Sequence, residues 1–204
     1  MTGLGRRAKY GLIETDRGDT MIFHLGMSGR WRIDPADIGK HDHLLVSTAG
    51  HQLSLNDPRR FGFVDLLETE RLATYPAFAA MGPEPLGPDL TARYLADALA
   101  GRAAPIKAML LDQRIIAGLG NIYVCEALHR AKLSPRAPAH LLTARQANRL
   151  AREIVATLNE AVEAGGSTLK DFSGADGAPG YFQHNFKVYD REGAACGHRA
   201  RRSC

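Results

Sequence analysis

The hydrophobic pattern of this chain changes its period once, at the proline- and glycine-rich stretch of residues 81–90. Before that stretch, short runs of β-branched and aromatic residues are separated by turn residues, which is typical of antiparallel strands. After it, apolar residues recur at intervals of three and four, which is typical of helices. Three prolines and two glycines make the stretch itself a linker. The pattern predicts an α+β protein with an all-β N-terminal region and a helical C-terminal region.

The turn signals divide the N-terminal region into short strands. The expected strands cover residues 9–14, 21–24, 31–33, 43–47, 52–55 and 63–67. In the C-terminal region a helix ends at Gly101, the next opens at Pro105, and a third covers 122–131. A long helix is expected over 144–164, because Thr143 and Gln146 form a capping box in front of it. A further strand is expected over 181–189.

These elements predict four regions. Residues 1–80 form an antiparallel sandwich or barrel, residues 81–166 a helical domain, residues 167–190 a loop and a strand, and residues 191–204 a tail.

Charge, cysteine content and hydrophobicity indicate which classes of protein this chain can belong to. The net charge is +4, and residues 103–204 hold 14 basic against 9 acidic side chains, which is compatible with a polyanion partner but does not require one. Three cysteines do not make a disulfide framework. The apolar runs are too short for a membrane span, and the chain does not start like a secretory signal. We expect a cytoplasmic monomer without a membrane partner.

The sequence GLGN at residues 118–121 interrupts an otherwise apolar helical stretch. A helix that starts after a tight glycine turn presents free backbone N–H groups, and Asn121 is a natural N-cap for it. Gly118 and Gly120 let a phosphate approach the backbone closely, so the break predicts a phosphate-binding site. A tight corner between two helices with no ligand explains the same residues.

Two turn motifs combine apolar and basic side chains. The motif HLGMSG (24–29) puts Met27 at the tip of a glycine-flanked turn, and NDPRRFG (56–62) puts two arginines beside Phe61. Apolar wedges and an arginine on loops can fill the gap that an extruded base leaves in a duplex. Taken separately, each motif is equally compatible with an ordinary surface turn.

Taken together and in this order, the motifs resemble the formamidopyrimidine-DNA glycosylases, bacterial base-excision repair enzymes of the helix–two-turn–helix superfamily. The resemblance runs from about Arg6 to about Gly193. The matching segments are RRAKY, HLGMSG, KHDH, NDPRRFG, GPEPL, IKAMLLDQ, AGLGNIYVCEAL, GGSTLKDF and GYFQHNFKVYDREG.

The resemblance implies an antiparallel β-sandwich, a helix–two-turn–helix domain and a C-terminal zinc finger. It implies the excision of 8-oxoguanine and formamidopyrimidines, with cleavage at the abasic site through a Schiff base and β-elimination. The implied partner is double-stranded DNA containing oxidised purines or abasic sites.

The resemblance also assigns roles to residues of this chain. Lys9, Gly120 and Asn121 would hold phosphates, and Met27, Arg59 and Phe61 would fill the void and contact the opposite base. Ser167, Thr168, Lys170 and Tyr181 would line the lesion pocket together with Lys107. Arg60 would brace its turn, and Glu126 would tie its helix to the sandwich.

The sequence departs from the family pattern at both ends. The family opens with a Pro-Glu motif that supplies the amine nucleophile and an acid–base group, whereas this sequence begins MTGLGRRAKY. We therefore expect an incomplete sandwich and no catalytic residue in these 204 residues, which would be inactive as written. Cys196 matches the first zinc ligand, and His198 and Cys204 could be ligands by type. Their spacing differs from two Cys-x-x-Cys pairs, so we expect a truncated finger without zinc.

Two other functions remain open at this level. The chain could be a damaged-DNA-binding module without catalysis, using the phosphate site and the wedge residues. It could also resemble the helix–two-turn–helix proteins that bind ribosomal RNA, although the two turn motifs have no role there.

Overall fold

The computed structural model describes residues 1–168 and 179–196, and it divides into two compact units. The β unit contains residues 1–79 and 164–183, and the helical unit contains residues 80–163 and 184–204.

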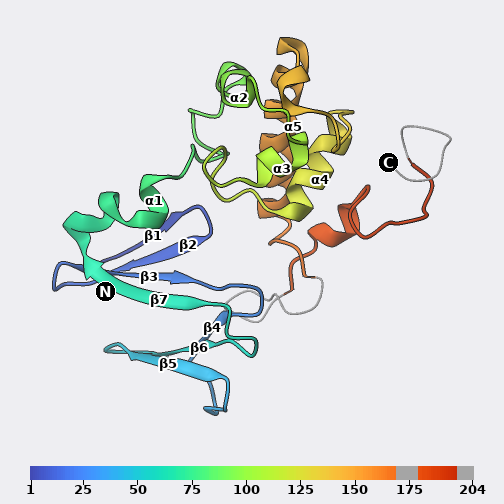
Figure 1. Ribbon diagram of the computed structural model, residues 1–204. Coiled ribbons are helices and arrows are strands. Elements are labelled where there is room, and N and C mark those ends of the chain that lie inside the picture. Colours follow the sequence, from blue (N-terminus) through green and yellow to red (C-terminus); the bar gives the residue numbers. More distant parts are fainter. Residues whose placement is uncertain (169–178, 197–204) are drawn as a thin grey trace. The chain divides into compact units, whose positions relative to one another are not determined.

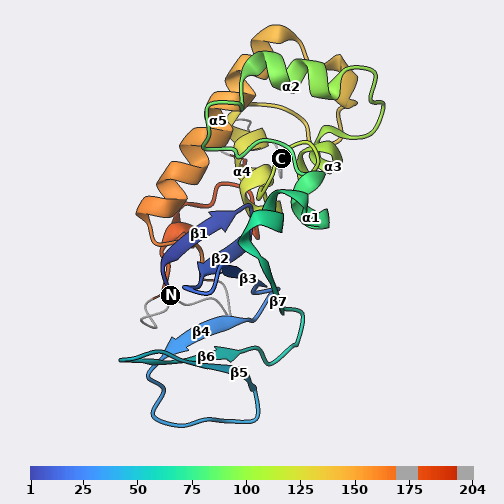
Figure 2. The same ribbon diagram turned by 90° about the vertical axis from the view of Figure 1, so that its left-hand side faces the viewer.

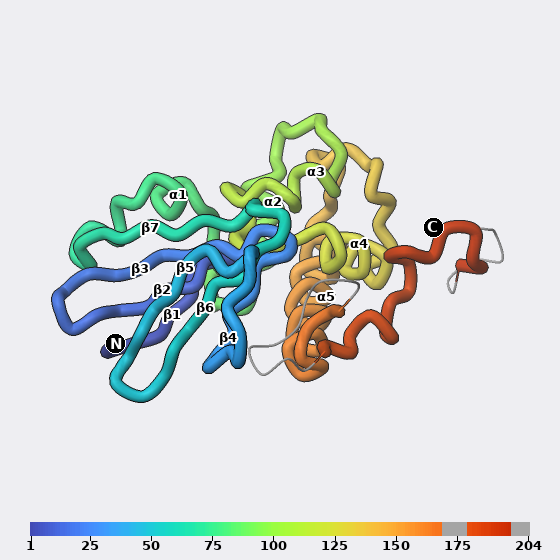
Figure 3. Tube along the Cα trace, turned by 90° about the horizontal axis from the view of Figure 1, so that it is seen from below, coloured from blue at the N-terminus to red at the C-terminus, as the bar shows by residue number. Residues whose placement is uncertain are grey.

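The β unit contains two antiparallel sheets. Strands β1 (Gly3–Arg7), β2 (Tyr10–Glu14), β3 (Asp19–His24) and β7 (Phe63–Glu68) form the first sheet in the order β1-β2-β3-β7. Strands β4 (Arg30–Ile33), β6 (Gln52–Asn56) and β5 (Asp42–Ser47) form the second in the order β4-β6-β5. Figures 1 and 3 show the sheets as two layers, and the Phe23 and Trp31 rings meet between them with centroids 5.4 Å apart.

The six expected strands are all present, and their turns lie where the sequence placed them. Strand β1 was not predicted, because Gly3–Arg7 contains two glycines and two arginines and has no apolar alternation. It forms because its backbone pairs with β2 in continuous register, from Gly3 opposite Glu14 to Arg7 opposite Tyr10. A pairing partner therefore made a strand from a segment of low intrinsic strand propensity.

The strand expected over residues 181–189 is a wrong prediction. Tyr181 makes one isolated bridge with Ser167, and Phe182–Asn185 is a 3-10 turn (η3). Tyr181 N donates to Ala164 O and Phe182 N donates to Gly166 O, so this backbone bonds to the segment that follows α5 in the chain rather than to a sheet. Two of the aromatic residues that suggested a strand, Phe182 and Phe186, are buried.

A short irregular region follows β7. It consists of a 3-10 turn η1 (Thr69–Thr74) and a helix α1 (Pro76–Ala79). The Phe78 ring packs edge-on against Tyr10 and Tyr75, at centroid distances of 5.3 and 5.0 Å, and covers one end of the first sheet.

The helical unit is built from α2 (Ala92–Leu99), α3 (Ile106–Leu111), α4 (Asn121–Arg130) and α5 (Ala144–Glu163), with a 3-10 turn η2 (Ala139–Leu141) before α5. Figure 2 shows the long helix α5 running beside the three shorter ones. Their buried core is apolar, and its fully buried members include Leu95, Leu110, Leu119, Leu128, Leu150 and Ile154.

The capping box predicted for α5 is confirmed. Gln146 N donates to Thr143 Oγ1 at 3.3 Å, and Thr143 N donates to Gln146 Oε1 at 2.9 Å. These reciprocal bonds satisfy backbone donors at the start of a helix, where no intrahelical partner exists. The mixed antiparallel and helical architecture agrees with the fold class that the sequence predicted.

Candidate nucleic-acid interface

The turn between β3 and β4, residues 25–29, presents Met27 to solvent with 65 % of its surface exposed. Gly29 N donates to Leu25 O at 2.8 Å and closes the turn. A Cβ at Gly29 would lie 2.4 Å from Leu25 O, and Gly26 has φ +62°, so both positions require glycine. The glycines that flank Met27 are therefore what raises this apolar side chain from the sheet. We call residues 25–29 the Met27 turn.

The turn after β6, residues 57–62, presents Arg59 and Phe61 in the same way, and we call it the Phe61 turn. The Phe61 side chain is 58 % exposed, and the Arg59 guanidinium lies over its ring at 5.0 Å from the centroid. Such a cation–π contact holds a flexible arginine against a flat apolar surface. The wedge and basic residues that the sequence singled out thus lie together on the β unit.

Two buried residues, Ser28 and Asp57, connect these turns. Ser28 Oγ donates to Asp57 Oδ1 at 2.6 Å and accepts from Arg59 N at 3.2 Å. Gly62 N donates to Asp57 Oδ2 at 2.8 Å. Burial alone would raise the pKa of Asp57, but the Ser28 hydroxyl and the backbone N–H groups outweigh burial and lower it. Asp57 is therefore an ionised acceptor at neutral pH.

Sequence reasoning missed Ser28 and Asp57 as a pair. Each belongs to a turn motif, and they lie 29 positions apart. The signal available in the sequence was a small polar residue close to the exposed side chain of each turn, Ser28 in one and Asp57 in the other. Such residues often supply the hydrogen bonds that the backbone of a buried turn needs. The sequence could not say which residue would partner which.

Arg60 was expected to brace its turn. It adopts the left-handed backbone with φ +58°, and its N–H donates to Asp57 O at 3.3 Å. Its side chain is exposed and makes no hydrogen bond within the residues that the structure describes. The observed bracing by side chains comes from Ser28 and Asp57.

Lys9 lies in the tight turn between β1 and β2, after Ala8 at φ +53°. Its side chain reaches solvent, yet desolvation by neighbouring atoms lowers its pKa below the ordinary lysine value. His24 also has a lowered pKa, first because of burial and then because of the nearby Lys9 charge. Gly26 N donates to His24 Nδ1 at 3.0 Å, so the second ring nitrogen carries the proton. Lys9 and His24 therefore offer two donors to an anion, and His24 was missed by sequence reasoning although it lies within the HLGMSG motif.

The glycine break in the helical unit is held by one side chain, that of Gln113. Its Oε1 accepts from Gly118 N at 2.7 Å, and its Nε2 donates to Leu111 O at 3.0 Å and to Leu119 O at 3.2 Å. Gly118 has φ +76°, which a side chain would strain. The break buries Ile116 and Leu119 completely and starts α4 at Asn121.

The prediction that Asn121 caps α4 is wrong. The N-cap is Gly120, with φ −108° and ψ 171°, and Asn121 is the first helical residue. Its side chain is exposed, and its Oδ1 accepts from Cys125 Sγ at 3.7 Å one turn later. An exposed amide at the start of a helix provides a donor for an oxyanion.

The other residues expected near a damaged base come from two separate segments. Lys107 lies half-buried in the first turn of α3, and its backbone N–H donates to Pro135 O at 3.2 Å. Thr168 Oγ1 accepts from Gly180 N at 2.8 Å, while Thr168 N donates to Gln183 Oε1 at 3.1 Å. Ser167 and Tyr181 form the bridge described above, and Lys170 lies outside the described residues.

Glu126 is a fully buried carboxylate on α4. It accepts four hydrogen bonds from the consecutive backbone N–H groups of Lys187, Val188 and Tyr189, at 2.9 to 3.1 Å. The expected connection of Glu126 to the sandwich is wrong. This residue ties α4 to residues 187–189 of the same unit, because a buried charge needs several donors and this turn supplies three.

No metal site is formed by residues 1–168 and 179–196, in which no three His, Cys, Asp or Glu side chains lie together suitably. Cys196 is the only expected zinc ligand among them, since His198 and Cys204 lie outside the described residues. One cysteine does not supply the four ligands of a zinc-finger site, so no step is assigned to zinc.

Comparison with known proteins identifies the family. The formamidopyrimidine-DNA glycosylase N-terminal domain matches residues 1–64, and the formamidopyrimidine-DNA glycosylase H2TH domain matches residues 81–173. The chain belongs to the formamidopyrimidine-DNA glycosylase family. The formamidopyrimidine-DNA glycosylase of Rhizorhabdus wittichii is 63 % identical over 197 residues, which cover 96 % of this chain and 73 % of that protein. The protein of the same name from Novosphingobium aromaticivorans is 61 % identical over 197 residues, with the same coverage.

Solved structures of the family agree with the fold. The MutM (Fpg) protein of Thermus thermophilus superposes with a TM-score of 0.89 at 41 % identity, covering 98 % of this chain and 74 % of that one. The Lactococcus lactis Fpg in complex with DNA containing an abasic site has a TM-score of 0.89 at 34 % identity, covering the same shares. Across the described part of this glycosylase-family chain, no helix is both long and apolar enough to span a bilayer.

Proposed function

We propose that these 204 residues recognise oxidised purines and abasic sites in duplex DNA, which is the lesion-binding step of base-excision repair by DNA glycosylases. The observation that carries the proposal is the pair of joined turns, which presents Met27, Arg59 and Phe61 on a buried Ser28–Asp57 support. Exposed apolar side chains on rigid turns are costly in water, and they suit insertion into a base stack.

The proposal divides the interface into positioning and discriminating parts. Lys9 and the start of α4 at Gly120 and Asn121 hold backbone phosphates, since charge and free N–H groups carry no sequence information. Met27 and Phe61 fill the space of the extruded nucleotide, and Arg59 contacts the base left unpaired opposite it. Lys107, Ser167, Thr168 and Tyr181 contact the damaged base, with Lys170 from the segment outside the described residues.

Relatives support the substrate class. Lactococcus lactis Fpg has been solved with DNA containing an abasic site and, as a variant, with DNA containing Fapy-dG. We extend these two DNA lesions, and 8-oxoguanine as a related oxidised purine, to the present chain. A substrate on the bacterial chromosome implies that the protein works in the cytoplasm.

The proposal is tested with a short duplex that carries a tetrahydrofuran abasic-site analogue. We expect the chain to bind this duplex at least about tenfold more tightly than an intact duplex of the same sequence. The double variant Met27→Ala, Phe61→Ala should lose this preference and keep its affinity for intact DNA. Equal binding of both duplexes by the unaltered chain would overturn the proposal.

The expectation that these 204 residues supply no catalytic amine is tested by borohydride trapping on a duplex with 8-oxoguanine opposite cytosine. We expect no covalent adduct for the 204-residue polypeptide, since none of its residues matches the amine nucleophile of the family. An adduct would contradict that prediction, because it requires an amine that reaches C1′ of the damaged nucleotide.

A further inference from the structure

The Ser28–Asp57 pair lies beneath three side chains that must enter one DNA lesion from two different loops. Met27 belongs to the turn after β3, whereas Arg59 and Phe61 belong to the turn after β6. Both support residues are buried, with 6 % of Ser28 and 4 % of Asp57 exposed, while Met27 and Phe61 above them are mostly exposed.

The two turns also touch through their backbones. A Cβ added to Gly26 would lie 2.6 Å from the carbonyl carbon of Phe61 and 2.7 Å from Gly62 N. A Cβ added to Gly62 would lie 2.8 Å from His24 O. The backbones of the two turns therefore pack so closely that no side chain fits at Gly26 or Gly62.

The backbone N–H and the backbone carbonyl oxygen of Asp57 both have hydrogen-bond partners outside the two turns. Its N–H donates to His41 O at 2.9 Å, and its carbonyl oxygen lies 3.0 Å from His43 Nε2. With its carboxylate committed to Ser28 and Gly62, every polar group of Asp57 has a partner. Asp57 thus joins three segments, the two turns and the loop that leads into β5.

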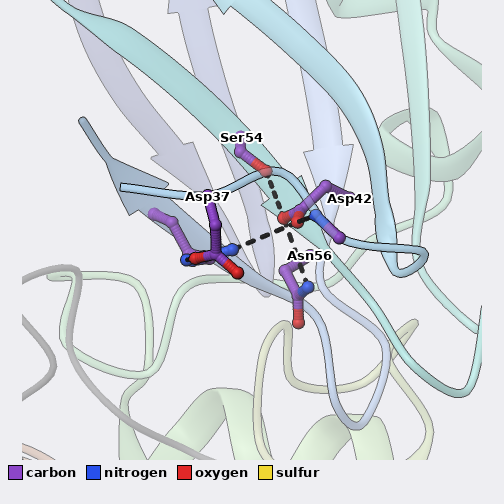
Figure 4. Close-up of polar contacts among 6 residues, drawn as sticks. Asp37, Asp42, Ser54 and Asn56 are labelled. Carbon is purple, nitrogen blue, oxygen red and sulfur yellow. Dashed lines mark hydrogen bonds and ion pairs between the residues drawn. The ribbon is translucent and has the colours of Figure 1, made fainter. Parts of the chain in front are cut away.

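That loop is itself fixed by Asp42, as Figure 4 shows. Asp42 accepts from Gly39 N at 2.7 Å, from Arg32 Nη1 at 3.1 Å and from Asn56 Nδ2 at 3.2 Å, with a further short bond from Ser54 Oγ. Asn56 is the residue directly before Asp57, so the anchored loop and the Phe61 turn share one support.

We propose that Ser28 and Asp57 are positioning residues that make Met27, Arg59 and Phe61 a single rigid probe, and that this rigidity sets which base is accepted opposite the damage. The inference rests on the proposed function. Its physical basis is preorganisation. Arg59, Met27 and Phe61 lose little conformational entropy on insertion when their relative positions are already fixed. A base in the wrong position cannot then be accommodated by the independent movement of one loop.

The variant Ser28→Ala removes the connecting hydroxyl and leaves every side chain of the probe in place. Its matched control is Thr20→Val, which removes another buried hydroxyl of the β unit, bonded to Thr69 Oγ1 at 2.9 Å near the opposite end of β3. Both changes cost stability, but only the first separates the turns. Asp57→Asn is the graded variant, since an amide keeps one acceptor for Gly62 N and loses the charge.

The decisive readout is the ratio of dissociation constants for two abasic-analogue duplexes that differ only in the opposite base, whichever base the unaltered chain prefers. We expect Ser28→Ala to bring this ratio about five- to tenfold closer to one, Asp57→Asn to give an intermediate ratio, and Thr20→Val to leave it unchanged. Amide hydrogen exchange at Arg59 and Gly62 in the free protein should accelerate in Ser28→Ala by a similar factor and stay unchanged in Thr20→Val.

An unchanged ratio in Ser28→Ala, with a loss of stability like that of Thr20→Val, would overturn the inference and leave Ser28 a purely structural residue. A ratio of one in the unaltered chain, with abasic DNA still preferred over intact DNA, would overturn it while the proposed function stands. If the unaltered chain shows no preference for abasic DNA, both the inference and the proposed function are overturned. The comparison of the abasic-analogue duplex with the intact duplex distinguishes these two cases.

Discussion

Gln113 Oε1 accepts a hydrogen bond from Gly118 N at 2.7 Å, and this bond closes the turn from which α4 starts. The same side chain donates to the carbonyl groups of Leu111 and Leu119, so one amide satisfies three backbone groups between the end of α3 and the start of α4. The linker packs on this segment as well, since Gly82 N donates to Gln113 O at 2.9 Å. The direction of the α4 N-terminus thus depends on a side chain that bonds to backbone groups.

Replacement of Gln113 by leucine should therefore weaken both the helical unit and its affinity for DNA. Three backbone groups lose their partner, which lowers the free energy of unfolding by about 2–3 kcal/mol. Denaturant unfolding followed by circular dichroism measures the loss. Asn148→Ala is the control, because Asn148 is exposed on α5 and its side chain makes no hydrogen bond within the described residues. A Gln113→Leu variant as stable as the control would show that the turn closes without this side chain.

The variant Glu126→Gln tests the buried carboxylate of α4. A glutamine keeps the shape but turns an NH₂ group towards backbone N–H donors that previously met an oxygen. We expect a loss of about 3 kcal/mol in the free energy of unfolding, since charge-assisted bonds are lost and a buried donor is left unpaired. The exposed Glu163 on the same unit, changed to glutamine, should cost less than about 0.5 kcal/mol. Equal stability of the two variants would contradict this assignment.

Acid should destabilise the β unit through Asp42. Burial of this fully buried carboxylate would raise its pKa, but bonds from Ser54, Gly39 N and Asn56, together with the Arg32 charge, lower it from 3.8 to about 2. A lowered folded-state pKa gives stability that is complete above pH 3.8 and is lost as the pH falls through 2.

The free energy of unfolding of Asp42→Asn should consequently be lower at pH 7 and should fall less steeply between pH 4 and pH 2 than that of the unaltered chain. Some slope will remain, because Asp57 and Asp34 also have lowered pKa values. Asp16→Asn, at an exposed turn, should leave the pH profile unchanged. A parallel profile for Asp42→Asn would exclude this carboxylate as a source of acid sensitivity.

Lys9→Met should weaken the binding of all duplexes to a similar extent, because a phosphate contact carries no sequence information. The slope of log affinity against log salt should decrease in magnitude by about 0.9, the value for one phosphate contact. Arg17→Gln, in the turn at the opposite end of β3, removes a positive charge from the same unit and should leave the slope unchanged. Equal slopes for Lys9→Met and the unaltered chain would exclude Lys9 from the phosphate contacts.

The sequence predicted the helices and strands of this protein far better than the contacts between segments that are distant in the chain. The change of period at residues 81–90, the turn residues and the Thr143–Gln146 capping box are local signals, so strands, helices and a helix start could be read from neighbouring residues. The turn motifs also indicated the family. Each motif is a contiguous run of residues, so both the motifs and their order could be read directly from the sequence.

Where a local signal was weak or ambiguous, the prediction was wrong. Residues 181–189 have strand-like composition, yet Tyr181 and Phe182 bond to Ala164 and Gly166. Gly3–Arg7 lacks strand-like composition but pairs with β2. Strand formation depends on whether a partner edge is available, and composition does not contain that information.

The sequence by itself determined the family, the secondary-structure types and the side chains that face DNA in the proposal: Met27, Arg59 and Phe61 are exposed because glycine and proline turns raise them. Only the tertiary structure decided what holds those side chains in place. Ser28 meets Asp57 across 29 residues, and Glu126 meets Lys187 across 61, because the pairing of buried polar groups follows from chain topology. Burial makes each such pairing obligatory, but the fold alone selects the partner.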